Sequence, residues 1–324
     1  MTYLLTADIH LDDKPENEYR WEVFTELDKV DADEIMILGD LTDRADYHSS
    51  RLVNRLVPQL KRRRRRVTIL RGNHDTPLNG PAYWSFLSEI SGIEYIDGPM
   101  GRNHRLLLLP STPDPAMDWQ AVAWDRHICT FMHQTVFGAT LRTGIYADKG
   151  MSLDIFPEGM RVYSGDLHYP HKIGCVTYVG APHPKNFGDD HDCRFLVLDD
   201  DFRIQKSVPL SPMRKHIIDV DSVAALRDFA VNPHDQVIVR FRMDPAHAEH
   251  WPRDRDTIAQ WAQQNDVNLV SSEPSAVFVR GTAAQPIAAT DPKQVLEAFG
   301  ISEGLDEHTM KVGMELLAEK VALG

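Results

Sequence analysis

The stretch VTILRGNHD, residues 67–75, decides the fold class, because a β-branched, apolar run is followed at once by Asn73, His74 and Asp75. Four other segments repeat this pattern of a short apolar run that ends in polar side chains: TYLLTADIH (2–10), EIMILGD (34–40), HICTFMH (127–133) and RVYSGDLH (161–168). Apolar runs of this length, rich in Ile, Val and Leu, are typical of strands buried on both faces. The repetition therefore predicts an α/β domain with polar side chains gathered at the strand ends.

Segments with helical spacing lie between these strands. Trp21, Phe24 and Leu27 recur every three residues and predict a helix over 18–30, while Leu52, Leu56 and Leu60 predict one over 48–61. Further strands are expected at RLLLLP (105–110), CVTYVG (175–180) and RFLVLD (194–199). This layout is that of a sheet covered by helices.

The pattern changes after residue 210. Strands are expected at 215–221, 236–243, 267–272 and 276–281, and helices at 222–231, with Ser222 as the N-cap, and at 256–264. We therefore predict a first domain over 1–210, a small α/β domain over 211–283 and a helical tail over 289–324. The tail has an apolar stripe at helical spacing that consists of Met310, Met314, Leu317 and Val321.

The composition is that of a soluble globular protein, with 42% hydrophobic and 26% charged residues among 324. No apolar window approaches the length of a membrane span, and Cys129, Cys175 and Cys193 lack metal-binding or redox spacing. A cytoplasmic localisation is therefore expected. The net charge of −13 argues against a general polyanion binder, but metal-holding carboxylates contribute to it, and residues 61–66 form a dense cationic run.

The polar side chains at the strand ends have the chemistry of a metal centre. Asp8 and His10 are two residues apart and point to the same side of an extended chain. The complete set of candidate ligands is Asp8, His10, Asp40, Asn73, His133, Asp166 and His168. Oxygen and imidazole ligands without thiolate suit two divalent ions, Mn²⁺ first and Mg²⁺ or Fe²⁺ as alternatives, rather than a structural zinc. Asp40 is the natural bridging ligand, and His74 is expected to act as a general acid or hydrogen-bond donor.

These motifs resemble those of a known enzyme family. Asp8-x-His10, Gly39-Asp40-x-x-Asp43-Arg44, Gly72-Asn73-His74-Asp75, His133 and Gly165-x-x-His168 resemble the five motifs of the calcineurin-like metallophosphoesterases. Within that family the chain resembles the SbcD nuclease subunit of bacteria and phages. The features that carry this resemblance are His133-Gln134, the YVGAP stretch (178–182), Phe187-Gly188-Asp189 and the small α/β unit that follows.

The resemblance implies a four-layer αββα sandwich and a role for each ligand. Asp8, His10 and His168 would hold the first ion, Asn73, His133 and the residue at position 166 the second, and Asp40 both, while His74 would act on the phosphodiester. The family's last motif is usually Gly-His-x-His, whereas this chain has Gly165-Asp166-Leu167-His168. Asp166 is expected to replace the missing imidazole, with His171 as the alternative ligand.

The resemblance also implies partners. It suggests a homodimer through helices near residues 48–61, a capping role for the small α/β domain on DNA, and docking of the C-terminal helices on an SbcC-type coiled-coil ATPase. Packing of those helices on their own domain is the alternative. Arg62, Arg63 and Arg64 are candidate DNA contacts, or else cations that face a helix end. The other histidines, His104, His127, His183 and His191, are expected to have no ligand role.

Taken together, the sequence predicts a two-metal-dependent DNA exonuclease or endonuclease that acts on double-stranded DNA ends. It would be the nuclease subunit of an SbcCD-like end-processing and repair complex. One alternative is a metallophosphoesterase that acts on a non-DNA phosphate ester. The other is a DNA-end-binding module whose metal site is attenuated by Asp166.

Overall fold

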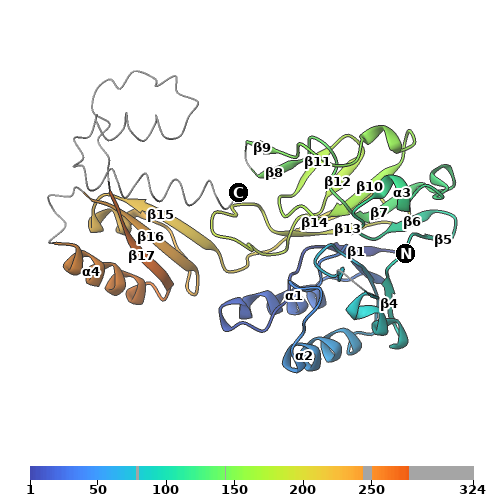
Figure 1. Cartoon of the computed structure of the whole chain (residues 1–324). Coiled ribbons are helices and arrows are strands. Elements are labelled where there is room, and N and C mark those ends of the chain that lie inside the picture. The colour runs from blue at the N-terminus through green and yellow to red at the C-terminus, as the bar shows by residue number, and fades with distance from the viewer. Residues whose placement is uncertain (78–79, 143, 244–249, 277–324) are drawn as a thin grey trace, which may run out of the picture. The chain divides into compact units, whose positions relative to one another are not determined.

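The computed structural model describes residues 1–77, 80–142, 144–243 and 250–276 (Figure 1). Met1–Arg242 and Glu249–Pro274 form one compact unit. A second unit, Met243–Ala248 and Ser275–Gly324, lies almost entirely outside the described residues. The expected tail over 289–324, with Met310, Met314, Leu317 and Val321, therefore lies outside the described residues, as does most of the expected strand at 276–281.

Two six-stranded sheets form the first part of the unit (Figure 1). The order of the first sheet is β14 (Ile204–Pro209), β13 (Arg194–Leu198), β1 (Tyr3–Thr6), β2 (Glu34–Ile37), β3 (Arg66–Leu70) and β4 (Ile93–Ile96). The order of the second sheet is β11 (His171–Ile173), β12 (Val176–Tyr178), β10 (Arg161–Gly165), β7 (Cys129–His133), β6 (Leu106–Leu109) and β5 (Met100–Arg102). Because β1 to β4 are parallel, and β6, β7, β10 and β12 are parallel, the carboxyl ends of neighbouring strands meet at one edge of each sheet.

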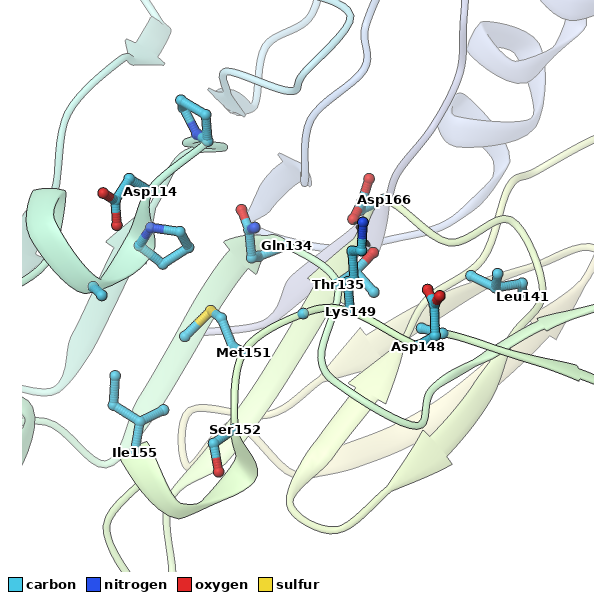
Figure 2. Close-up of a pocket in the computed structure, with 15 residues that line it drawn as sticks. Asp114, Gln134, Thr135, Leu141, Asp148, Lys149, Met151, Ser152, Ile155 and Asp166 are labelled. Atoms are coloured by element: carbon cyan, nitrogen blue, oxygen red, sulfur yellow. Dashed lines mark hydrogen bonds between the residues drawn. The ribbon is translucent and has the colours of Figure 1, made fainter.

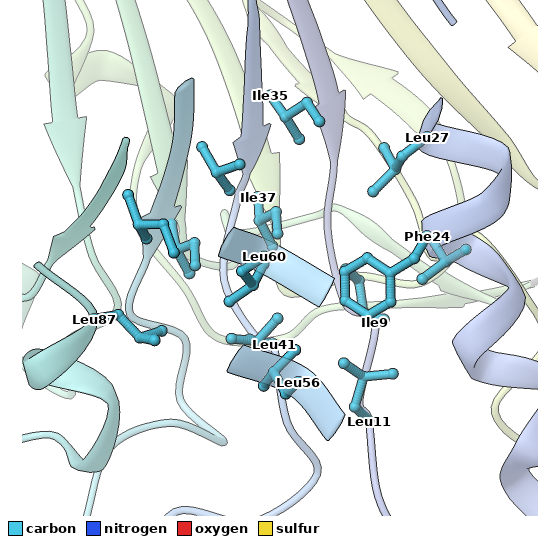
Figure 3. Close-up of a cluster of buried hydrophobic side chains, with 14 of the residues drawn as sticks. Ile9, Leu11, Phe24, Leu27, Ile35, Ile37, Leu41, Leu56, Leu60 and Leu87 are labelled. Atoms are coloured by element: carbon cyan, nitrogen blue, oxygen red, sulfur yellow. The ribbon is translucent and has the colours of Figure 1, made fainter. Parts of the chain in front are cut away.

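Alternation along the strands produces the layers. In β2, Ile35 and Ile37 face the helices α1 (Val23–Lys29) and α2 (Ser50–Lys61), whereas Met36 faces the second sheet. Figure 3 shows Ile35 and Ile37 with Phe24, Leu27 and other side chains of the helix-facing core. All the predicted strands of residues 1–200 are present, and the fold is a mixed α/β sandwich.

The layer that covers the outer face of the second sheet, the fourth layer of the sandwich, is thin. The outer face of the second sheet packs against Trp119, Met151 and Phe156. These residues follow or adjoin short helical segments, namely α3 (Pro115–Asp118) and the 3-10 helices Trp124–Arg126 and Leu153–Ile155. This face is therefore covered by single turns and loops rather than by long helices.

The helix predicted over 18–30 is divided. A 3-10 helix, Pro15–Glu22, precedes α1, and it contains Trp21, whereas Phe24 and Leu27 lie in α1. The Trp21 Nε1–H donates to the Asp12 carbonyl at 3.1 Å, which holds this segment against the loop after β1. The second helix is as predicted, and α2 is capped by the Ser49 hydroxyl, which accepts from the Leu52 N–H at 3.0 Å.

The small α/β part contains a sheet in the order β15 (Lys215–Val220), β16 (Gln236–Met243) and β17 (Asn268–Ala276), with helix α4 (Trp251–Gln264). The helix expected over 222–231 is instead a 3-10 helix, Val223–Asp228, and the Ser222 side chain makes no capping hydrogen bond. Phe229 packs edge-on against His216 of β15, with ring centroids 5.6 Å apart, so the chain leaves the helix early. Helix α4 begins before the expected residue 256, with Pro252 in its first turn.

The boundaries between the predicted domains, at residue 210 and at 283–289, stay predictions. Cys129, Cys175 and Cys193 are free thiols. Among the described residues, no helix has the length and apolar character that crossing a bilayer requires.

Candidate metal centre

Four of the candidate ligands leave their strands in the left-handed backbone region. The φ angles are +55° for Asp8, +49° for His10, +51° for Asp40 and +81° for Asp166. Residues with side chains adopt this region at a cost, and such conformations cluster at functional sites. Two backbone hydrogen bonds join the segments that follow β1 and β2. The Asp8 N–H donates to the Gly39 carbonyl at 3.1 Å, and the His10 N–H donates to the Asp40 carbonyl at 2.9 Å. The turns therefore fix the two acidic exits side by side.

Two glycines permit this close approach. A Cβ at Gly39, which has a φ of +91°, would lie 2.1 Å from His133 Nδ1, and a Cβ at Gly72 would lie 2.1 Å from Asp40 Oδ1. Both contacts are far inside van der Waals distance, so neither position accepts a side chain. The left-handed backbone of Gly39 also allows the chain to turn sharply out of β2 just before Asp40.

The first ligand group brings Asp8, His10 and His168 together. One ligand atom of each lies within 4.8 Å of the others, and the two Nε2 atoms of His10 and His168 are 3.1 Å apart. Burial lowers the pKa of His10 to about 4 and, with the neighbouring His10, the pKa of His168 to about 3. Both imidazoles are therefore neutral at physiological pH, the form in which histidine binds a metal.

The second group consists of Asn73, His133 and Asp166. His133 Nε2 lies 2.8 Å from Asn73 Oδ1 and 3.8 Å from Asp166 Oδ1. The other nitrogen of His133, Nδ1, donates to the Leu38 carbonyl at 2.6 Å. A backbone carbonyl on the second nitrogen is the usual way in which proteins orient a metal-binding histidine.

Asp40 lies between the two groups. Its Oδ2 is 3.4 Å from His10 Nε2, and its Oδ1 is 3.4 Å from His133 Nε2. Asp8 also faces both groups, because it forms a second possible ligand cluster with Asp40 and His133. The carboxylate oxygens of Asp40 thus point to opposite sides, as a bridging ligand requires.

The carboxylates that surround His133 favour the binding of positive charge in the site. Burial by itself lowers the pKa of His133, but the carboxylates of Asp40, Asp8 and Asp166 outweigh it and raise that pKa well above its usual value. Burial raises the pKa of Asp8 well above its usual value, with Asp40 and Asp166 adding to the effect. Three carboxylates around one imidazole are unfavourable in a dry site unless cations neutralise them.

An unpartnered oxygen provides a direct test of fit for a metal. Asp8 is fully buried, and its Oδ2 has no hydrogen-bond partner among the described residues. A buried carboxylate oxygen without a donor is costly, and a divalent cation would satisfy it. The donor set of carboxylate, amide and imidazole groups fits such an ion.

His74 lies beside the first group. Its backbone N–H donates to Asp40 Oδ1 at 2.9 Å, and its Nδ1 lies 3.1 Å from the Asp43 carbonyl. His74 also belongs to a possible ligand cluster with His10 and Asp40, with ring centroids 4.7 Å from His10. The Asp43 contact places the proton of the neutral ring on Nδ1.

Asp43 lies in a quoted motif and Lys185 lies between the YVGAP stretch and Phe187, but neither residue was assigned a role from the sequence. Lys185 Nζ is 3.1 Å from Asp43 Oδ1 and 3.1 Å from His10 Nδ1. Its loop is fixed at two points, since the Lys185 N–H donates to the Asp189 carboxylate at 3.0 Å and the Lys185 carbonyl accepts from Lys215 Nζ at 3.0 Å. An ammonium group is therefore held at the rim of the candidate metal centre.

Asp75 organises two ligand loops at once. Its buried carboxylate accepts from the N–H groups of Leu41 and Thr42, each at 3.2 Å, and from the Gly72 N–H at 3.0 Å. It also accepts from the Thr42 hydroxyl at 3.2 Å. Leu41 follows Asp40 and Gly72 precedes Asn73, so one side chain positions ligands from two strands.

The alternative ligand His171 is engaged elsewhere. Its Nε2 accepts from the Thr140 N–H at 2.9 Å, its Nδ1 lies 2.8 Å from the Tyr169 carbonyl, and its ring stacks on Tyr178. Asp166, by contrast, faces His133 and accepts a short hydrogen bond from the Thr135 hydroxyl. Asp166 therefore lies beside His133, and its role as a ligand stays a prediction.

The cationic run serves mainly to hold helix ends. The Arg63 side chain is 3% exposed, donates to the Phe24 carbonyl at 2.7 Å and pairs with Asp28 at 3.2 Å. The prediction that Arg63 contacts DNA is therefore wrong, because its guanidinium group is buried. Arg65 donates to the Leu27 carbonyl at 2.8 Å. Arg62 pairs with Asp28 at the surface, and Arg64 is exposed. The interpretation as cations that face a helix end fits Arg63, which also donates to the Gln59 carbonyl in the last turn of α2.

The four histidines expected to have no ligand role lie outside the ligand clusters. His127 Nδ1 and His191 Nε2 contact the carbonyls of Ala123 and Ala181. His183 is buried, and neither of its ring nitrogens has a hydrogen-bond partner in the described part of the chain.

Comparison with known families gives a match for residues 1–133 to the model described as calcineurin-like phosphoesterase. The matched part is similar to that family and ends at His133, so Asp166 and His168 lie beyond it. Among solved structures, the chain is similar to the nuclease MPE of Pseudomonas putida, at 15% identity over 64% of this chain and 87% of that one, with a TM-score of 0.34. It is also similar to a novel archaeal phosphodiesterase, at 12% identity over 65% of this chain and all of that one (100%), with a TM-score of 0.34. No match was found among curated proteins.

Proposed function

We propose that the chain is a two-metal phosphodiesterase that hydrolyses DNA, the nuclease subunit of an SbcCD-like end-processing complex. One observation carries the proposal: Asp40 lies between two groups of candidate ligands, with one of its oxygens 3.4 Å from a histidine nitrogen on each side. A shared carboxylate of this kind is typical of two-metal sites that act on phosphate esters.

Each ligand has a defined place in the proposal. Asp8, His10 and His168 hold one ion, Asn73, His133 and Asp166 hold the other, and Asp40 contacts both. Divalent ions held there would supply a water activated for attack and would neutralise charge that develops on the phosphoryl group. Mn²⁺ is the first candidate because the second ion would meet two carboxylates, Asp166 and the shared Asp40, and one imidazole, His133.

The remaining groups act on the substrate. The Asp43 carbonyl accepts a hydrogen bond from the Nδ1–H of His74, and this contact keeps the ring oriented. His74 Nε2, when protonated, can donate to the oxygen of the leaving group. The Lys185 ammonium, at the rim beside Asp43, is placed to attract a phosphate oxygen into the site.

DNA as the substrate is supported by the motif resemblance over residues 1–189 and by the small α/β part after residue 210. The homodimer and the ATPase partner belong to the same proposal, and the helical tail over 289–324 is its proposed docking element. A phosphatase that acts on small esters is the competing function.

The test is Mn²⁺-dependent cleavage of end-labelled linear duplex DNA, compared with hydrolysis of an aryl phosphate monoester. We expect cleavage of DNA, its loss in Asp40→Ala together with both ions, and its loss in His74→Ala with the metal content kept. Loss of a positioned acid lowers the rate by about 10²–10⁴. Hydrolysis of the monoester alone would refute DNA as the substrate, and an active Asp40→Ala variant would refute the metal bridge.

A further inference from the structure

A large cavity adjoins the candidate metal centre at Asp166. It has a volume of about 710 Å³ and lies between the segment around α3 and the hairpin of β8 (Thr140–Arg142) and β9 (Ile145–Tyr146). Gln134 and Thr135, which directly follow His133, also line it. Figure 2 shows Gln134, Thr135 and Asp166 together on one side of the cavity, away from Ser152 and Ile155. A group bound in the cavity is thus a direct neighbour of a phosphate bound at the metals.

The lining has two kinds of surface. The apolar part comes from prolines and aliphatic side chains, namely Pro113, Pro115, Ala116, Leu141, Met151 and Ile155. The polar part includes Gln134, Ser152 and Lys149. Apolar walls with a few polar groups are typical of small-molecule sites, and a nucleoside presents flat apolar faces and hydrogen-bonding edges to such walls.

The charges exclude a phosphate inside the cavity. Besides Asp166, the carboxylates Asp114 and Asp148 line it, against the single ammonium of Lys149. A net negative lining repels a polyanion but tolerates an uncharged base and sugar. The phosphate of a bound nucleotide is therefore directed out of the cavity, toward the metal side.

The size limits what can enter. A volume of about 710 Å³ lies within the range of about 300–1,000 Å³ that is usual for small-molecule pockets. A volume in this range suits a ligand of the size of a single nucleoside.

We infer that this cavity binds the unpaired nucleoside next to the scissile phosphate. The inference rests on the proposed function and adds to it that the nucleotide at the cleaved bond must leave the duplex before it is cut. The β8–β9 hairpin supports this, because Tyr146 on it is 64% exposed and offers a ring face on which a further unpaired base can stack.

The first test is binding of thymidine to the metal-free protein, measured by saturation-transfer NMR. Ala116→Trp places an indole in the cavity from an exposed position, so folding is preserved, and Ala121→Trp places one on an exposed site that does not line the cavity. We expect at least a tenfold rise in the Kd for thymidine in Ala116→Trp and no change in Ala121→Trp. Absence of thymidine binding to the wild type, or equal binding by Ala116→Trp, would overturn the inference.

The second test is hydrolysis of thymidylyl-thymidine and of methyl p-nitrophenyl phosphate, both with Mn²⁺. We expect Ala116→Trp to raise KM for the dinucleotide at least tenfold and to change kcat/KM for the small diester less than twofold. An equal loss on both substrates would overturn the inference. If the wild type hydrolyses neither substrate yet binds thymidine in the cavity, the proposed function fails and the nucleoside site stands.

Discussion

Replacing Asp75 by asparagine should loosen both the Asp40 loop and the Asn73 loop. Asp75 is fully buried and accepts four hydrogen bonds, from the Leu41, Thr42 and Gly72 N–H groups and from the Thr42 hydroxyl. Asparagine keeps one acceptor oxygen and turns an NH₂ group toward donors, so at least one or two of the four donors lose their partner. Each buried unpartnered group costs about 1–3 kcal/mol.

The expected cost to the free energy of unfolding is therefore about 1–6 kcal/mol, a large share of the roughly 5–15 kcal/mol that holds a typical domain folded. Urea denaturation in EDTA measures it without any contribution from bound metal. The same variant should bind the second ion about 10–100-fold more weakly, as is usual when a group that supports metal ligands is lost. Titration with Mn²⁺ measures that affinity.

Asp97→Asn is the matched control, because Asp97 is an exposed aspartate that directly follows β4 of the same sheet. It should leave both the unfolding free energy and the metal affinity unchanged. An Asp75→Asn variant as stable as the wild type, with unchanged Mn²⁺ affinity, would refute the view that Asp75 positions the two ligand loops.

Three further changes test other parts of the site. Lys185→Met should lower kcat/KM for a phosphodiester about 10–100-fold, the range expected for one lost charge-assisted hydrogen bond, and should keep the metal content. Lys185→Arg should recover part of the activity, and Lys172→Met, at an exposed lysine, is the control. Loss of metal in Lys185→Met would contradict the role of Lys185 in binding the substrate. Burial lowers the pKa of His183 well below 6.5, so the unfolded chain binds a proton that the folded chain does not, and stability falls as the pH drops below about 6.5. His183→Leu should make the free energy of unfolding, measured by urea denaturation, depend less steeply on pH, by up to about 1.4 kcal/mol per pH unit. An unchanged pH dependence would contradict the assignment to His183. Asp166→His should shift metal preference toward Zn²⁺ or Fe²⁺ over Mn²⁺ in competition experiments analysed by mass spectrometry, because imidazole suits those ions; Asp148→His, on the cavity wall, should not.

The strand-end pattern made the sheets and the ligand cluster predictable. Asp8, Asp40, Asn73 and His133 each follow or end a short apolar run, and parallel strands bring such ends together whatever the loops between them do. The buried face of α2 was predictable for a similar reason, because Leu52, Leu56 and Leu60 have a helical repeat and lie in the core.

Other features depend on contacts between distant segments, which periodicity does not report. Lys185 reaches Asp43, and Thr135 reaches Asp166, across long stretches of sequence. The segment before α1 is a 3-10 helix whose Trp21 side chain donates to the Asp12 carbonyl, a contact that the repeat does not report. Arg63 appeared to be a surface cation in the sequence, but its contacts with the Phe24 carbonyl and the Asp28 carboxylate hold it in a largely buried place.

Anomalous diffraction from crystals of the Mn²⁺-loaded protein tests the central claim most directly. Two Mn²⁺ peaks are expected about 3.5–4 Å apart, with Asp40 in contact with both. Asp8, His10 and His168 should surround one peak, and Asn73, His133 and Asp166 the other. A single peak, or two peaks of which Asp40 contacts only one, would contradict the account.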